Sequence, residues 1–238
     1  MNLCLVMPAY NESGCIVDVV EKWTKFLAKK FADEAVMIVV NDGSKDNTGQ
    51  LLEQLSTKIP HLKVVHQANG GHGAAVLNGY KKAIELNPEW VFQTDSDDQF
   101  KPEDFDKLWE KRNDSLFITG YRQVRHDPLH RLVITRIVRT LLLLLFGVPL
   151  FDSNVPYRLM QGRFLKALLK ELPGYVFAPN IFLALLARAS GQNLFEVPIQ
   201  HEERKTGTIS IIKWKLLKVC FRSAKELALF RLGFCDSV

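Results

Sequence analysis

The sequence predicts an α/β protein, with a mostly parallel β-sheet covered by helices on both faces. Short apolar runs alternate with amphipathic helical patterns over residues 1–120, and such alternation is typical of a parallel sheet. Polar segments rich in Asn, Asp, Gly and Ser follow the apolar runs, at the sheet edge where ligands bind in this class of fold. With 238 residues and 47% hydrophobic content, the chain is long enough for one large domain.

Five strands and four helices are expected in the first half. The strands are short apolar runs bounded by turn residues, namely Leu3–Met7, Ala35–Val40, Leu62–His66, Trp90–Thr94 and Leu116–Gly120. The helices carry apolar residues at helical spacing, namely Cys15–Lys30, Thr48–Leu55, Gly73–Leu86 and Pro102–Arg112. Asp46 or Asn47 is the expected N-cap of the second helix, and Pro102 suits the first turn of the fourth.

The alternation weakens after residue 120, and this half is expected to elaborate the same domain. Its expected helices are Arg131–Phe146, Gly162–Leu169 and Ile181–Ser190, and its expected strands are Tyr157–Met160 and Leu194–Ile199. A loop over His201–Thr208 then leads to a last helix from about Ile209 to Leu232. The sequence shows no internal repeat or low-complexity stretch.

The net charge of +5 is unevenly distributed. Residues 1–120 hold 13 Lys and Arg against 18 Asp and Glu, whereas residues 121–238 hold 18 against 8. A basic second half indicates an anionic partner, which could be nucleic acid, a phosphate ligand or an anionic membrane.

The cysteines and the apolar stretches bear on the compartment. Cys4, Cys15, Cys220 and Cys235 show no C-x-x-C spacing, which argues against a zinc site or a disulfide framework and favours a reducing compartment. The N-terminus lacks the charged region of a signal peptide, and the most apolar stretch, Leu141–Phe151, is too short to span a membrane. We therefore expect no transmembrane helix in this chain.

The segment Thr94–Gln99, with Asp95 and Asp97 one residue apart, is the most informative polar motif. If the strand continued, alternation would put both carboxylates on one side, where they could share a divalent cation. Hard oxygen ligands suit Mg²⁺ or Mn²⁺. A solvated turn is the alternative, because Asp is a common turn residue. The polar ends of the other strands, Pro8–Glu12, Asn41–Ser44 and Gln67–Gly73, would meet at the same rim, which favours a binding site.

Four motifs together resemble the family 2 glycosyltransferases with the GT-A fold, in order and in spacing. They are Pro8–Glu12, Asn41–Thr48, Asn69–Gly73 and Asp95–Gln99. Within that family the chain resembles the dolichyl- and polyprenyl-phosphate sugar transferases. The features that carry this second resemblance are Gln99, Gly120-Tyr121-Arg122, Phe151-Asp152, Tyr157-Arg158-Leu159, Glu196–Ile199, Arg204 and Gly207.

The resemblance implies a role for particular residues. The donor, a UDP- or GDP-sugar, would be bound by Pro8, Tyr10, Glu12, Asp42, Asp95 and Ser96. Mg²⁺ or Mn²⁺ would be held against its diphosphate by Asp95, Asp97 and Gln99. The phosphate of a polyprenyl phosphate lipid would be held by Arg122, Arg136 and Arg204, since the arginine fork can bind two phosphate oxygens. Asp97 and these three arginines are the expected catalytic residues.

Two positions depart from the family pattern. Asn41 stands where many relatives have Asp, and Pro179-Asn180 stands where relatives that glycosylate a hydroxyl carry a Glu-Asp pair. The Asp of that pair is their general base, so its absence disfavours a sugar-hydroxyl acceptor. A phosphate monoester is mostly dianionic at neutral pH and needs no base.

The last expected helix carries a basic stripe flanked by apolar residues. Lys215, Lys218, Arg222 and Lys225 form the stripe, and Trp214, Leu217, Phe221 and Phe230 are among the residues beside it. Such a helix commonly lies in a membrane interface, although a packed helix with a solvated face would show the same pattern. We expect a GT-A domain over residues 1–208, with a nucleotide-sugar half (1–120) and an acceptor half (121–208), followed by this helix over 209–238.

The expected function is an inverting, metal-dependent sugar transfer from a nucleotide to a polyisoprenyl phosphate. It would take place peripherally on the cytoplasmic side of an anionic membrane, without nucleic acid. One rival is a family 2 enzyme with a non-lipid acceptor. A second is a nucleotidyltransferase, which would need a glycine-rich turn in place of Pro8–Glu12. A third, a non-catalytic membrane or nucleic-acid binding module, is disfavoured by the acid pair Asp95 and Asp97.

Overall fold

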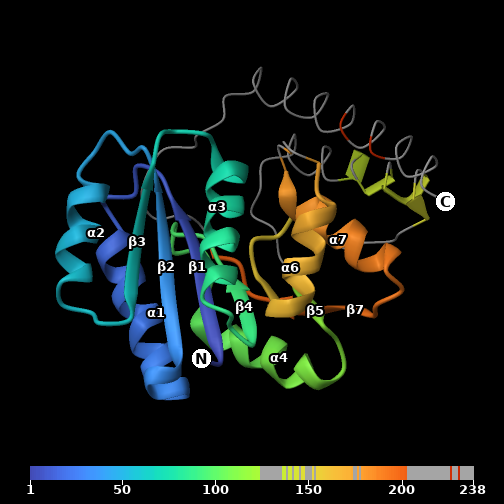
Figure 1. Ribbon diagram of the computed structural model, residues 1–238, viewed down its shortest axis with the longest axis horizontal. Helices are drawn as coiled ribbons and strands as arrows, with labels where there is room; N and C mark the ends of the chain where they lie inside the picture. The colour runs from blue at the N-terminus through green and yellow to red at the C-terminus, as the bar shows by residue number, and fades with distance from the viewer. Residues whose placement is uncertain are drawn as a thin grey trace.

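A computed structural model gives the fold (Figure 1). It describes residues 1–123, 136–137, 139–140, 142–144, 146–147, 152, 154–173, 176, 178–202, 226 and 230. The strands are β1 (Leu3–Ala9), β2 (Ala35–Asp42), β3 (Leu62–Gln67), β4 (Trp90–Gln93), β5 (Phe117–Arg122), β6 (Arg158–Gln161) and β7 (Leu194–Ile199). The α-helices are α1 (Ile16–Phe31), α2 (Thr48–Ser56), α3 (His72–Glu85), α4 (Phe105–Trp109), α6 (Gly162–Glu171) and α7 (Pro179–Ala189). Short 3₁₀ turns cover Ala32–Glu34, Pro102–Asp104 and Glu110–Asn113.

The seven strands form one sheet in the order β3-β2-β1-β4-β6-β5-β7. All neighbouring pairs are parallel except β6, which runs antiparallel to both β4 and β5. The chain leaves β1 toward β2 and β3 on one side and returns to β4 on the other. In open α/β sheets, ligands bind beyond the carboxyl ends of the strands at such a reversal of strand order.

Side-chain alternation along the central strands divides the core into two layers. Leu3, Leu5 and Met7 of β1 face the layer of α1, α2 and α4, whereas Cys4 and Val6 face α3, α6 and α7 (Figure 1). Helix α3 lies so close to the sheet that a Cβ on its residue 79 would come within 2.4 Å of a Val6 methyl, and this position is a glycine. The buried layers keep the polar loops at the carboxyl ends of the strands in a fixed arrangement.

The structure confirms the predicted fold class and most of the predicted elements. It corrects two of them and adds one feature. Residues 102–113 form a 3₁₀–α–3₁₀ series instead of one helix, and β6 is an antiparallel strand within the predicted, mostly parallel sheet. Strand β4 ends at Gln93, so Asp95 and Asp97 lie in a loop and strand alternation does not place their side chains. The expected last helix, about Ile209 to Leu232, lies outside the described residues except for two positions, Glu226 and Phe230.

The described part of the chain holds no helix that is both long enough and apolar enough to cross a membrane. Phe230 packs on the α7 layer, with its ring centroid 5.2 Å from that of Phe182 and 6.3 Å from that of Phe146. Phe230, an apolar residue of the expected last helix, therefore packs against the core.

Candidate active site

The loop after β1 is tied to the loop after β2 by four backbone N–H donors. Asn11 donates to the Ser44 hydroxyl at 3.0 Å, and Lys45 donates to the Asn11 side-chain oxygen at 2.7 Å. Glu12 donates to the Thr48 hydroxyl at 2.8 Å. The fourth bond runs from Ser13 N–H to the Asp46 carboxylate at 3.1 Å. These bonds fix the segment that carries Tyr10 and Glu12, two of the predicted donor-binding residues.

Asp42 is buried at the end of β2 and holds the glycine-rich loop. Its carboxylate accepts hydrogen bonds from the Gln67 side chain at 2.7 Å, from Gly70 N–H at 2.8 Å and from Gly71 N–H at 2.9 Å. The Asn69 side chain donates to the Asp42 carbonyl at 2.9 Å. Asp42 was predicted to hold the base or ribose. The structure adds a loop-anchoring role that turn statistics do not reveal.

Glu12 joins the first loop to the loop of the acid pair. Its side chain is 8% exposed, and one carboxylate oxygen lies 3.5 Å from the Cys15 thiol. The same thiol lies 3.4 Å from the carbonyl oxygen of Ser96, which is itself buried. Pro8 is buried within β1, and Tyr10 is partly exposed where β1 ends. Of the predicted donor residues near the first loop, Glu12 and Ser96 are therefore brought together, through Cys15.

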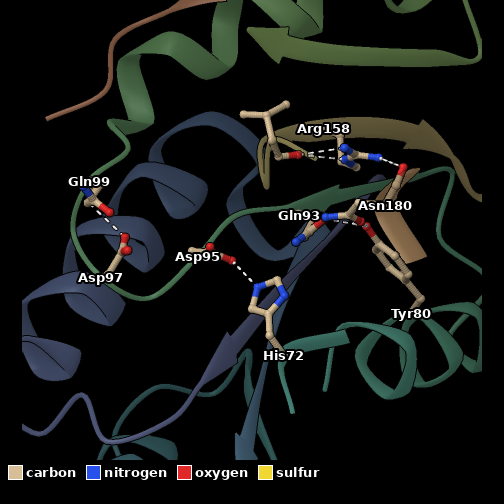
Figure 2. A network of polar contacts seen from close by, with 9 residues as sticks. His72, Tyr80, Gln93, Asp95, Asp97, Gln99, Arg158 and Asn180 are labelled. Carbon is tan, nitrogen blue, oxygen red and sulfur yellow. Dashed lines mark hydrogen bonds and ion pairs between the residues drawn. The ribbon is translucent and has the colours of Figure 1, made fainter. Parts of the chain in front are cut away.

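The two acidic side chains of the pair have different partners (Figure 2). Asp95 accepts a hydrogen bond from His72 Nε2 at 3.1 Å, whereas Asp97 accepts one from Gln99 N–H at 3.3 Å. Desolvation opposes a charge on His72, but the carboxylates of Asp95, Asp97 and Asp42 outweigh it and raise the pKa of His72 above its ordinary value. Three carboxylates thus create a negative potential at the rim beside the glycine-rich loop.

These oxygens form a donor set that suits a hard divalent cation. The side-chain N–H₂ of Gln99 donates to the Glu202 carbonyl at 2.8 Å. The amide oxygen of Gln99 is therefore a possible metal ligand beside the carboxylates of Asp95 and Asp97. Within the described ranges, no cluster of three His, Cys, Asp or Glu side chains could hold a metal ion by itself. The fit is that of a site in which protein oxygens bind one side of Mg²⁺ or Mn²⁺ and substrate phosphates the other.

The predicted phosphate-binding arginines differ in their surroundings. Arg122 is mostly buried and binds both oxygens of the buried Asp152 carboxylate, through Nε at 2.7 Å and Nη2 at 3.0 Å. Arg136 is exposed. Arg204 lies outside the described residues. The structure therefore gives Arg122 a carboxylate partner that the sequence did not predict.

A buried polar network lies to the right of the acid pair in Figure 2. The Tyr80 hydroxyl donates to the Gln93 side-chain oxygen at 2.6 Å, and the Asn180 side-chain oxygen lies 3.3 Å from that hydroxyl. The Asn180 carbonyl accepts from Nη1 of the fully buried Arg158 at 2.7 Å. Burial lowers the pKa of Arg158 and raises that of Tyr80.

Sequence reasoning missed this network as a unit. Tyr80 has the spacing of a core residue. Arg158 was named only as part of a motif on which the family resemblance rests. Its four members come from α3, β4, β6 and α7, so no local pattern in the sequence connects them.

A match to a family model identifies the class of protein. The model described as Glycosyl transferase family 2 matches residues 4–146. The structure resembles that of glucosyl-3-phosphoglycerate synthase from Mycobacterium tuberculosis, with a TM-score of 0.67 and 17% sequence identity over 98% of this chain and 80% of that chain. The fold and the site thus define a glycosyltransferase with the GT-A fold. The chain belongs to glycosyl transferase family 2.

Three relatives illustrate the similarity. An uncharacterized protein of Methanocaldococcus jannaschii is 30% identical over 94% of this chain and 98% of its own length. The UDP-N-acetylglucosamine–dolichyl-phosphate N-acetylglucosaminyltransferase of Methanococcus voltae is 29% identical over 82% of this chain and 84% of its own. The undecaprenyl-phosphate 4-deoxy-4-formamido-L-arabinose transferase of Pseudomonas fluorescens is 24% identical over 91% of this chain, which spans 62% of that relative.

Proposed function

We propose that the protein transfers a sugar from a nucleotide-sugar donor to a polyisoprenyl phosphate, with inversion at the anomeric carbon and with a divalent metal. Two of the relatives are named for transfer to dolichyl phosphate or undecaprenyl phosphate, which supports an acceptor of this kind. The donor would be a UDP- or GDP-sugar, and the acceptor phosphate would attack from the face opposite the leaving diphosphate.

The observation that carries this proposal is the environment of Asn180, at the N-terminus of α7. By the family resemblance, this is the position of the general base in relatives that glycosylate a hydroxyl, but the amide of Asn180 does not titrate. It is 2% exposed, and it is bonded to Tyr80 and Arg158. A hydroxyl acceptor needs a base in hydrogen-bond reach, whereas a phosphate dianion already carries its nucleophilic oxygen.

The donor is proposed to bind beyond the carboxyl ends of the strands, where the strand order reverses. Tyr10 and Glu12 lie on the first loop, and Pro8 lies in the strand just before it. Asp42 keeps one carboxylate lone pair beyond those that accept from Gln67, Gly70 and Gly71. Asp95, Asp97 and Gln99 would hold the metal, which when bound offsets the negative charge that builds on the leaving diphosphate. The solved structure named above contains Mn²⁺ and UDP, which supports a divalent cation in this fold.

The acceptor phosphate is proposed to lie among Arg122, Arg136 and Arg204. The exposed Arg136 is available for direct contact. Arg122 is held in place by its ion pair with Asp152, and it would contribute positive charge beside the phosphate from that fixed position. Charge-assisted bonds of this kind hold a phosphate in line for attack.

Membrane attachment is proposed for the second half. Among the described residues, the large apolar side chains that are exposed are Met1 and three from residues 136–147: Ile137, Leu143 and Leu144, the last at 76%. The exposed Arg136 and Arg139 lie beside them, and apolar and basic side chains on one face are typical of a segment in a membrane interface. The stripe of Lys215, Lys218, Arg222 and Lys225, in the proposed C-terminal unit 209–238, would add charge attraction.

A panel of sugar nucleotides tests the function. UDP- and GDP-sugars would be incubated with a short polyprenyl phosphate, with and without Mn²⁺, and scored for glycolipid. We expect product from one donor class and none without a divalent metal. Glycerol 3-phosphate serves as the non-lipid phosphate control, and transfer to it alone would contradict the lipid acceptor.

A further inference from the structure

A chain of side-chain hydrogen bonds runs from the exposed face of α2, across the edge strand β3, to the loop after β1. His66 Nε2 lies 2.6 Å from a carboxylate oxygen of Glu53, and His66 Nδ1 lies 2.9 Å from Nδ2 of Asn41. The other end of that amide, Asn41 Oδ1, accepts from Ser44 N–H at 3.2 Å. The Ser44 hydroxyl in turn accepts from Asn11 N–H at 3.0 Å.

Each link fixes the direction of the next. A carboxylate only accepts, so Glu53 selects the imidazole tautomer with its proton on Nε2, and Nδ1 of His66 is then an acceptor. Only the N–H₂ end of the Asn41 amide can bond to that acceptor. Its oxygen therefore faces Ser44. If the amide were rotated by half a turn, two donors would face each other at Ser44.

The packing around Asn41 and His66 leaves room for their hydrogen bond. Asn41 is 6% exposed, so a wrongly oriented amide could not be satisfied by bulk water. Helix α2 passes the amide at Gly49, where a Cβ would lie 2.8 Å from Asn41 Nδ2 and 3.6 Å from the His66 ring. A glycine inside a helix costs about 1 kcal/mol relative to alanine. Here it makes room for Asn41.

We propose that His66 is a positioning residue for donor binding: it holds the Asn41 amide in the one orientation that closes the Ser44 turn, and thereby sets the loop that carries Tyr10 and Glu12. This rests on the proposed function, in which that loop binds the nucleotide. His66 itself is on the edge strand, and its hydrogen bond toward the loop is made to Asn41. Its effect would therefore fall on donor affinity, through the geometry of the loop.

The first test compares two histidines. His66→Ala should speed hydrogen exchange at the Ser44 and Asn11 amides and weaken binding of UDP or GDP, with Mg²⁺ present, by about three- to tenfold, the range for one lost hydrogen bond. His61→Ala is the matched control: the two side chains are 44% and 45% exposed, and His61 also has a carboxylate partner, Asp33. It should change neither quantity.

The second test separates amide orientation from packing. A carboxylate has two equivalent acceptor oxygens, so it can accept from Ser44 N–H in either orientation. Asn41→Asp in the His66→Ala background should therefore restore the exchange rate of the Ser44 amide to within about twofold of the wild-type rate. A histidine that acted only by packing would not be replaced in this way. Nitrogen-15 NMR of the wild type should show the His66 proton on Nε2.

Three results would overturn the proposal: unchanged Ser44 exchange in His66→Ala, no recovery in the double variant, or a His66 proton on Nδ1 alone. If the wild type bound neither nucleotide, the proposed function would fail instead. The exchange and NMR data would still decide the role of His66.

Discussion

The side chains of the acid pair illustrate what one residue contributes at this site. Asp95 is engaged by His72 and Asp97 by the backbone of Gln99, whereas the next acid, Asp98, forms an ion pair with Lys22. Three acidic residues in four positions therefore have three different partners. The proposed metal ligands are Asp95 and Asp97, whereas Asp98 is engaged at the surface by Lys22.

The first prediction follows from this assignment. Asp97→Asn should keep the fold and remove most of the activity, because the metal loses a charged ligand. The wild type should lose activity with a chelator and regain it with Mg²⁺ or Mn²⁺. Asp98→Asn is the matched control and should keep the activity and the metal requirement. Full turnover in excess EDTA would disprove the metal assignment.

The second prediction separates two arginines by what each one binds. Arg122→Ala leaves the buried Asp152 carboxylate without this partner and should lower the free energy of unfolding by about 3–5 kcal/mol. Arg136 is exposed, so Arg136→Ala should change stability by less than about 0.5 kcal/mol. It should instead raise the concentration of lipid phosphate needed for half-maximal activity by about tenfold or more, which is the effect of a lost charge-assisted bond.

Denaturant unfolding and acceptor titration at fixed donor measure these two effects. In the double variant Arg122→Ala/Asp152→Asn, the loss of stability should be partly reversed, since the lone carboxylate is gone. If Arg136→Ala weakened nucleotide binding as much as lipid binding, this arginine would instead serve the donor diphosphate.

At the scale of elements, the start of α2 shows how one side chain organises two loops. Asn47 occupies the N-cap position, but its side chain makes no capping bond. Asp46 instead accepts from Thr48 N–H at 3.0 Å, from the Thr48 hydroxyl at 2.6 Å and from Ser13 N–H at 3.1 Å. Desolvation alone would raise the pKa of Asp46, but the hydrogen bonds from Thr48 and Ser13 outweigh it and lower that pKa.

The third prediction concerns this helix start. Asp46→Ala should destabilise the protein by about 1 kcal/mol at neutral pH, because the first turn of α2 loses a side chain that accepts from its N–H groups, as an N-cap residue does. Because the folded pKa is the lower one, the stabilisation is complete above the unfolded pKa of about 3.9 and fades as the pH falls through the folded value. Unfolding of both proteins from pH 7 to pH 2 measures the difference. Asn47→Ala, the matched control, should have little effect at any pH.

The helices and strands also show which parts of the fold can be predicted from the sequence. Alternating apolar runs and helical patterns predicted β1 to β4 and their helices, because each element there is set by local periodicity. The insertion of β6 between β4 and β5 was not predicted, since strand order depends on packing between distant segments. The motif residues Asp42, Asp95 and Asp97 were found as turn-like polar clusters. Arg158 and Asn180 were named only through the family resemblance, and their contacts with Tyr80 and Gln93 were not predicted, because isolated polar residues in the core form no local sequence pattern.

For the whole molecule, the uneven charge of the two halves bears on where the protein acts. The acidic half holds the proposed metal and nucleotide sites, and the basic half carries the exposed apolar side chains of residues 136–147. This division fits an enzyme that receives its donor from solution and its acceptor from a membrane. Each basic residue near an anionic surface contributes about 1 kcal/mol, and salt screens this attraction.

The fourth prediction tests this orientation. Reversing Lys215, Lys218, Arg222 and Lys225 to Glu should release the protein from anionic vesicles without changing nucleotide affinity. The same reversal at four exposed lysines of the first half, Lys25, Lys29, Lys58 and Lys81, is the charge-matched control and should leave vesicle binding largely intact. Vesicle sedimentation at low and high salt gives the measurement. Binding that ignored both the stripe and salt would reject the role of this helix.

The account as a whole depends on a phosphate acceptor that needs no protein base. The most direct measurement offers the enzyme a sugar nucleotide with an equal mixture of a short polyprenyl phosphate and the matching polyprenol, which lacks only the phosphate. The account predicts a single product, a glycosyl phosphodiester of inverted anomeric configuration by ³¹P and ¹H NMR, with the polyprenol untouched. Sugar attached to the polyprenol hydroxyl, or retention at the anomeric carbon, would contradict it.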